Sequence, residues 1–170
     1  AMDTVHAKLD SLVGGGGEVH AYTDMLGQLH AGASANSAVD AVLGGGHVML
    51  CTPTASGKSL GYNLPALHAL ATDASARCLY LFPTKALAQD QLRALRALSS
   101  AGAPSLFGVR VDTYDGDTPS EDRALLRAQT RIFLTNPDML HAAVLPHHKE
   151  WAHVLSHLSH VVIDEAHMYR

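Results

Sequence analysis

From Ala38 onward, short apolar runs alternate with stretches of helical periodicity, and this alternation constrains the fold more than any other feature. The runs are apolar throughout rather than at every second position, which is typical of strands buried on both faces of a parallel sheet. The sequence therefore predicts an α/β fold in which a mostly parallel sheet is flanked by helices. The five expected strands are HVMLC, RCLYLF, VRVDTY, RIFLT and HVVID.

Helices are expected between these strands, over residues 59–70, 85–99, 120–129, 137–144 and 151–158. In the second of them Ala88, Leu92 and Leu95 fall on one face, as an amphipathic helix requires. Pro65 lies inside the first helix and predicts a kink there. Ser120 is the expected N-cap of the third helix.

The N-terminal segment, residues 1–37, is predicted to be irregular or flexible. It contains a run of four glycines, Gly14–Gly17, and the small polar stretch HAGASANS, both typical of irregular chain. A short helix could form over residues 22–29. The organised domain is therefore expected over residues 38–170.

Composition excludes several classes of protein. Hydrophobic residues make up 47% of the chain, and no apolar run reaches the length that a membrane span needs. Without a signal peptide at the N-terminus, we expect an intracellular protein with no membrane partner, nuclear if eukaryotic and cytoplasmic if bacterial. The two cysteines are too few for a disulfide framework or a four-cysteine zinc site. The net charge of -4 argues against a broad basic face for nucleic acid.

A phosphate-binding loop is predicted between the first strand and the first helix. The segment resembles the pattern G-x-x-x-x-G-K-[ST], although Thr52 stands where the first glycine belongs. Backbone N–H groups and the helix N-terminus can hold the β-phosphate, Lys58 can reach the β- and γ-phosphates, and the Ser59 hydroxyl can bind Mg²⁺. The predicted loop is Thr52, Pro53, Thr54, Ala55, Ser56, Gly57, Lys58 and Ser59.

An acidic pair follows the last apolar run, in the segment VVIDEAH. Asp164 is expected to bind Mg²⁺, and Glu165 to orient and polarise the water that attacks ATP. His167 is placed to couple the γ-phosphate site to a neighbouring domain. Each motif alone also fits a chance G-K-S or a solvated Asp-Glu turn, but the two together predict Lys58 facing the carboxylates across Mg²⁺.

Four segments, TPTASGKS, FPTKALAQDQ, TNPDML and VVIDEAH, resemble motifs I, Ia, Ib and II of superfamily 2 helicases in that order. The segments TYDGDTP, LPHHKEW and DEAHMYR resemble more specifically the bacterial YprA (MrfA-type) helicases and their eukaryotic RecQ-four-like relatives. The resemblance covers about residues 38–170. It implies a RecA-like domain, ATP and Mg²⁺ as cofactors, and ATP-driven 3′-to-5′ translocation on single-stranded DNA, with roles in DNA repair.

The resemblance also implies the residues that contact nucleic acid. Hydroxyls, an amide and helix N-terminal N–H groups bind phosphates without much net charge, which suits an acidic chain. The implied contacts are Pro83, Thr84 and Lys85 of motif Ia, and Thr135, Asn136 and Pro137 of motif Ib. Relatives carry a glutamine that reads adenine upstream of the loop. No glutamine stands at the corresponding residues, 32–35, so ATP follows from the resemblance alone.

Two other functions remain open beside a DNA helicase. One is an RNA helicase or RNA-remodelling ATPase, and the other is a truncated nucleotide-binding module without catalysis. A metal site at His153 and His157, four residues apart, is also conceivable, but no third ligand is positioned by the sequence. Packing or surface roles therefore suit these histidines, and His147 and His148, better.

The sequence reads as a RecA-like domain truncated after the Walker B strand, without motif III or the second RecA-like domain. That second domain carries the arginine finger in this family. We therefore expect residues 1–170 alone to unwind no duplex and to hydrolyse ATP poorly. A single-turnover unwinding assay on purified residues 1–170 checks this, and efficient strand separation would contradict it.

Overall fold

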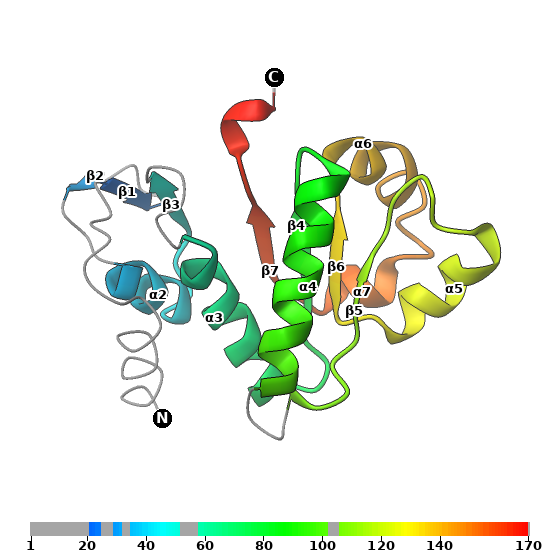
Figure 1. The fold of residues 1–170 in the computed structure, drawn as a ribbon, viewed down its shortest axis with the longest axis horizontal. Coiled ribbons are helices and arrows are strands. Elements are labelled where there is room, and N and C mark those ends of the chain that lie inside the picture. The colour runs from blue at the N-terminus through cyan, green and yellow to red at the C-terminus, as the bar shows by residue number, and fades with distance from the viewer. Residues whose placement is uncertain (1–20, 25–28, 32–34, 52–57, 102–105, 170) are drawn as a thin grey trace. The chain divides into compact units, whose positions relative to one another are not determined.

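The computed structural model describes residues 21–24, 29–31, 35–51, 58–101 and 106–169 (Figure 1). Contacts divide the chain into two compact units, residues 1–65 and 66–170, and the boundary falls inside helix α3, Lys58–Thr72. The predicted phosphate loop, residues 52–57, lies outside the described residues. None of the described helices has the length and apolar character needed to cross a membrane.

The first unit contains a small antiparallel sheet with the strand order β2-β1-β3. Its helix α2 ends at three glycines, of which Gly45 adopts a left-handed φ of 85°, and the Gly46 N–H donates to the Ala41 carbonyl. A glycine in the left-handed conformation is a common way to end a helix. The elements of the unit are β1 (Ala21–Asp24), β2 (Leu29–Ala31), α2 (Ala35–Leu43), β3 (Val48–Cys51) and the first part of α3.

Two predictions for this part of the chain are wrong. A short helix was expected over residues 22–29, but the described residues of that stretch, 22–24 and 29, lie in strands, and α2 begins at Ala35, inside the stretch expected to be irregular. The run HVMLC does form a strand, but β3 pairs antiparallel with β1 and exposes 58% of Met49. A helix of eight residues is marginal by itself, whereas pairing with β3 satisfies the backbone of β1. An apolar run alone does not specify the direction of its partner.

The second unit confirms the predicted parallel sheet, with the strand order β5-β6-β4-β7 (Figure 1). Strand β4 lies between β6 and β7, and all five of its residues are buried. The remaining elements match the expected order. They are β4 (Arg77–Leu81), α4 (Lys85–Ala101), β5 (Val111–Thr113), α5 (Ser120–Gln129), β6 (Ile132–Thr135), α6 (Pro137–Met139), a π-helical turn (Leu140–Val144), α7 (Ala152–Ser156), β7 (Leu158–Ile163) and a 3₁₀ turn (Ala166–Met168).

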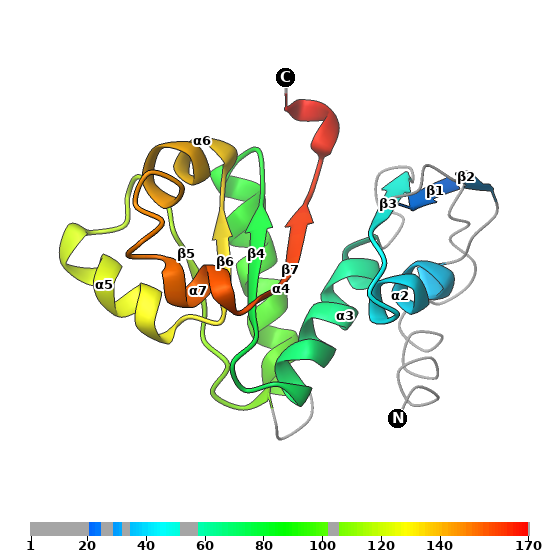
Figure 2. The same cartoon turned by 180° about the vertical axis from the view of Figure 1, so that it is seen from behind.

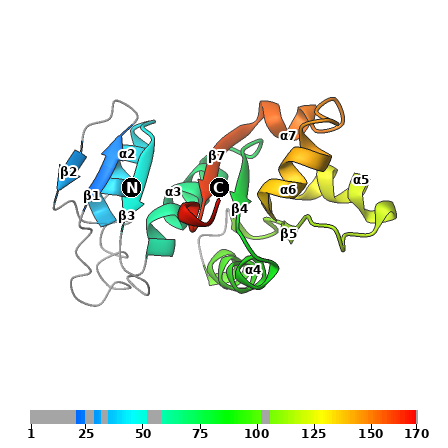
Figure 3. The ribbon, with the colours of Figure 1, turned by 90° about the horizontal axis from the view of Figure 1, so that it is seen from above.

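Helices cover both faces of this sheet. Seen from above, α4 lies on one side, and α6 and α7 lie on the other (Figure 3). Ala88, Leu92 and Leu95 of α4 are buried, as their spacing predicts. In the view from behind, α7 lies in front of the sheet (Figure 2). The core on that side contains Leu79, Leu81, Tyr114, Leu126, Phe133, Val144, Trp151 and Val154.

Two details differ from the sequence-based expectations. Pro119, not Ser120, is the N-cap of α5, and no side chain caps that helix; the Ser120 hydroxyl instead donates to Glu121. Strand β7 is less buried than expected, because Val161 and Ile163 are 53% and 54% exposed. Among the described residues β7 pairs with β4 alone, so it forms an edge of the sheet.

Cys78 is predicted to be chemically inert. Burial in β4 raises the pKa of its thiol to about 11, so roughly a thousandth of it is ionised at pH 8, and the thiolate is the reactive form. We expect iodoacetamide to label Cys78 much more slowly in the folded protein than in urea, as measured by peptide mass spectrometry. Equal labelling in both states would show that β4 is not closed in this way.

Candidate functional site

The carboxyl ends of β4, β6 and β7 bring the predicted motif segments to one edge of the sheet. Leu81, the last residue of β4, pairs with Thr135 on one side and Ile163 on the other. The Phe82 N–H donates to the Thr135 carbonyl at 2.9 Å, and the Asp164 N–H donates to the Leu81 carbonyl at 3.0 Å. Motifs Ia, Ib and II therefore leave the sheet side by side. In open α/β sheets, this edge is where ligands bind.

The acidic pair is held in a strained turn directly after β7. Glu165 has φ 48° and ψ 45°, and it is the only non-glycine residue in the described part of the chain with a positive φ. The turn is braced because the Glu165 N–H donates to a carboxylate oxygen of Asp164 at 2.9 Å. A left-handed conformation costs about 1–2 kcal/mol for a residue with a side chain, and such strain clusters at functional sites.

Two further side chains surround this acidic turn. His167 lies 3.4 Å from a carboxylate oxygen of Glu165, so it can form an ion pair when protonated. Tyr169 has a buried hydroxyl without a hydrogen-bond partner in the described structure. Burial, and then the negative charge of Asp164, raises the pKa of this phenol to about 12. Tyr169 was not among the predicted site residues, since only its place after the acidic motif distinguishes it in the sequence.

The donor atoms here fit magnesium. Mg²⁺ prefers oxygen ligands, and in phosphate-loop sites it is held by one or two carboxylates together with phosphates and water. Asp164 supplies such oxygens, and Ser59 lies in the first turn of α3. Among the described residues, no group of three or more His, Cys, Asp or Glu side chains could hold a metal ion. The pair His153 and His157 therefore has no third ligand there. Lys58 begins α3 in the first unit, so its pairing with Asp164 and Glu165 stays a prediction.

Motif Ia follows β4 and starts helix α4. The Thr84 hydroxyl oxygen accepts from the Leu87 N–H at 3.3 Å, which leaves its own hydrogen free to be donated. Lys85 is the first residue of α4, and its ammonium group lies 2.5 Å from a carboxylate oxygen of Asp117. Thr84 and Lys85 are exposed, while Pro83 is half-buried. These positions suit the predicted contact with a phosphate backbone.

Motif Ib shows a division of roles. The Asn136 carboxamide oxygen caps α6 by accepting from the Met139 N–H at 2.8 Å, which leaves its NH₂ group to donate elsewhere. Pro137 occupies the first helical position, as predicted. Thr135 is buried, and its hydroxyl donates to the Tyr114 carbonyl at 2.6 Å. Thr135 therefore fits the role of joining β6 to the end of β5 better than the predicted contact.

The segments TYDGDTP and LPHHKEW, far apart in the sequence, meet through two aromatic rings. Tyr114 and Trp151 pack edge to face with ring centroids 4.8 Å apart, and Phe133 lies 5.3 Å from Trp151. Outside them, Arg127 pairs with Glu150 at 2.9 Å. Sequence analysis singled out these segments without assigning them a role. The structure shows that both serve the core beneath the carboxyl edge.

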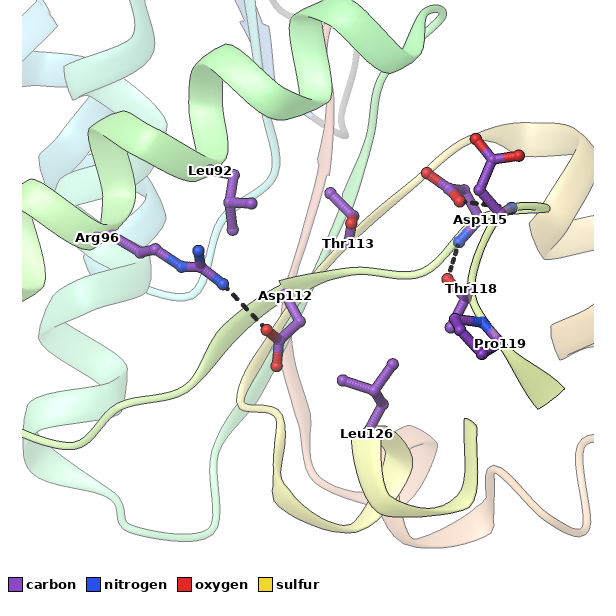
Figure 4. Close-up of a pocket in the computed structure, with 9 residues that line it drawn as sticks. Leu92, Arg96, Asp112, Thr113, Asp115, Thr118, Pro119 and Leu126 are labelled. Carbon is purple, nitrogen blue, oxygen red and sulfur yellow. Dashed lines mark hydrogen bonds and ion pairs between the residues drawn. The ribbon is translucent and has the colours of Figure 1, made fainter. Parts of the chain in front are cut away.

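Between β5 and α5, the turn formed by residues 115–118 lies beside a hollow of about 260 Å³ (Figure 4). Asp112 on its floor is held by Arg96 and by Arg110. The Asp115 N–H donates to the Thr118 hydroxyl at 2.9 Å across the turn. Asp112 and the backbone of the turn are therefore already paired within the protein, and Asp117 of the turn reaches the predicted site at Lys85.

Comparison with known proteins gives a consistent family. The DEAD/DEAH box helicase family matches residues 34–170. The chain is 48% identical over 133 residues to the ATP-dependent helicase HRQ1 of Saccharomyces cerevisiae, covering 78% of the chain and 12% of that protein. It is 48% identical over 134 residues to the uncharacterized ATP-dependent helicase YprA of Bacillus subtilis, covering 79% of the chain and 18% of that protein.

Solved structures agree with these relatives. The crystal structure of the DUF1998 helicase MrfA bound to DNA and AMPPNP matches with a TM-score of 0.75 and 36% identity, over 96% of this chain and 26% of that one. The chain therefore spans less than a fifth of the length of the two curated relatives and about a quarter of the solved one.

Replacing Trp151 should test the aromatic core beneath the site. Trp151 is 1% exposed, and truncating a buried Trp to Ala typically costs about 3–5 kcal/mol. We expect Trp151→Ala to lower the free energy of unfolding by that amount in urea titrations, and Trp151→Phe to lower it less. Phe107→Ala is the matched control, because Phe107 is 64% exposed and should shift stability by under about 0.5 kcal/mol. Equal effects of Trp151→Ala and Phe107→Ala would contradict this packing.

Proposed function

We propose that this chain, which belongs to the DEAD/DEAH box helicase family, supplies the ATP-binding domain of a motor that moves along single-stranded nucleic acid. The observation that carries the proposal is the carboxyl edge of the parallel sheet. There the backbone hydrogen bonds of β4 with β6 and β7 bring the segments of motifs Ia, Ib and II side by side. A motor needs this proximity, because nucleotide hydrolysis must change the contacts to the strand.

ATP is the proposed substrate, with Mg²⁺ as the metal. Lys58 and Ser59, together with the backbone of residues 52–57, are proposed to hold its phosphates. Magnesium bound at Asp164 would neutralise charge on the transferred phosphoryl group. Glu165 is proposed to orient the attacking water, and the braced, left-handed turn fixes the Glu165 backbone relative to the Asp164 carboxylate. His167, beside Glu165, is proposed to relay the state of the γ-phosphate to a second RecA-like domain.

Single-stranded nucleic acid is the proposed track, and DNA is favoured over RNA. The solved relative was bound to DNA, and the most similar curated relatives include HRQ1 and YprA. A role in DNA repair, inside the cell, follows as part of the same proposal. Weaker similarity to an ATP-dependent RNA helicase, DBP6 of Candida glabrata, at 29% identity, keeps an RNA-directed motor as the second candidate. The retained Lys58, Asp164 and Glu165 argue against a module without catalysis.

Substitutions at the proposed catalytic residues should abolish ATP hydrolysis in the full-length protein. We expect Lys58→Ala and Glu165→Gln each to lower the turnover rate by about a hundredfold or more, because each removes a group that acts in the transition state. The measurement is steady-state phosphate release with saturating single-stranded DNA. Lys149→Ala is the control, since it removes an exposed lysine that lies outside both motifs.

The same assay separates DNA from RNA. Stimulation by an oligodeoxynucleotide is compared with that by an oligoribonucleotide of the same sequence and length. Stronger stimulation by DNA is expected, and stronger stimulation by RNA would favour the second candidate. Turnover retained by Lys58→Ala at the level of Lys149→Ala would contradict the motor itself.

A further inference from the structure

The turn between β5 and α5 contains two carboxylates, those of Asp115 and Asp117. Three hydrogen bonds fix it: the Asp117 N–H donates to an Asp115 carboxylate oxygen at 2.8 Å, and the Thr118 N–H donates to the Asp115 carbonyl at 3.1 Å. The third is the bond from the Asp115 N–H to the Thr118 hydroxyl (Figure 4). None of these bonds uses the Asp117 side chain. The turn therefore positions the Asp117 backbone without depending on the Asp117 carboxylate.

The Asp117 carboxylate is directed at the lysine of motif Ia. Lys85 and Asp117 are 32 residues apart in the sequence, and their charged atoms are 2.5 Å apart. The hydrogen bond to Asp117 raises the pKa of Lys85; burial opposes this rise, and the negative charges of Asp117 and Asp115 add smaller increases. The ammonium group is therefore fully charged at neutral pH, and its nearest counter-ion belongs to the protein.

This pair contributes little to the fold. Its two side chains are 53% and 79% exposed, and ion pairs so open to water add little to stability. Lys85 is also one of the groups proposed to contact the nucleic-acid backbone. An exposed lysine at the predicted phosphate site thus already carries a carboxylate where a phosphate would bind.

We propose that Asp117 sets the affinity of the nucleic-acid site by competing with a backbone phosphate for Lys85. A strand that binds must displace the carboxylate, and Asp117 then remains near the phosphate and weakens the contact. The contact is therefore weaker than a lysine alone would give, as suits a motor that must release its track at each step. This inference rests on the proposed function, because it takes Lys85 as a phosphate contact.

Replacing Asp117 with asparagine tests the competition. The full-length protein without nucleotide is titrated into a fluorescein-labelled oligothymidine, and anisotropy is read at low and at physiological salt. We expect Asp117→Asn to bind about twofold to fivefold more tightly at low salt, with a smaller gain at higher salt because ions screen exposed charges. Asp117→Glu keeps the charge and should bind as the unmodified protein does.

The matched control is a substitution of Asp90, which lies on α4, the helix that begins at Lys85. Asp90 and Arg93 form an exposed ion pair on α4, so Asp90→Asn makes the same change in net charge without touching Lys85. We expect no gain in affinity from it. Thermal unfolding of Asp117→Asn should match that of the unmodified protein, since the turn keeps its three hydrogen bonds.

A double-mutant comparison decides whether the effect passes through Lys85. Lys85→Ala should weaken binding. In the Lys85→Ala protein, Asp117→Asn should raise the affinity by no more than the Asp90→Asn control does. The inference would be overturned if Asp117→Asn raised the affinity equally with and without Lys85, or if Asp117→Asn alone raised it not at all. Either result would leave the proposed motor function unaffected. Failure of the unmodified protein to bind oligothymidine would instead overturn the proposed nucleic-acid function, and this inference with it.

Discussion

The pairing of Leu81 with a strand on each side is the constraint on which the rest of the second unit depends. Parallel strands cannot be joined by a tight turn, so every connection must pass over a face of the sheet and return to the same end. Each strand consequently delivers its next residues to one edge. The β4 backbone bonds there to motif Ib on one side and to motif II on the other. The segments proposed to contact nucleic acid and the carboxylates of motif II are thereby joined by a few backbone hydrogen bonds.

The sequence predicted the elements of the second unit well, because each carries its own local pattern. Apolar runs bounded by turns became β4 and β6, and the face of Ala88, Leu92 and Leu95 became the buried side of α4. The first unit was predicted less well. Whether HVMLC pairs in parallel or antiparallel fashion is decided by contacts distant in the sequence, which an apolar run does not encode.

The candidate site also combines features that the local sequence predicts with features that depend on the fold. Asp164 and Glu165 could be named from their motif, whereas the left-handed φ of Glu165 could not, because it arises from the turn that β7 must make. Thr135 shows another side of this: its motif predicts contact with nucleic acid, while in the structure its hydroxyl donates to the Tyr114 carbonyl inside the protein. The motifs therefore predict a region of the sheet edge, and the fold adds which side chains there already have partners inside the protein.

The acidity of the chain is compatible with binding a polyanion once the local charges are considered. A net charge of -4 weakens long-range attraction, but it does not determine the field within the first contact shell. Among the groups proposed to contact nucleic acid, the Thr84 hydroxyl and the Asn136 amide are neutral donors. Neutral donors bind phosphate without a large salt-dependent term. Lys85, the charged group among them, is already partly neutralised by the protein. In the proposed motor, weak and short-range contacts of this kind would allow a nucleic-acid strand to be held and released in turn.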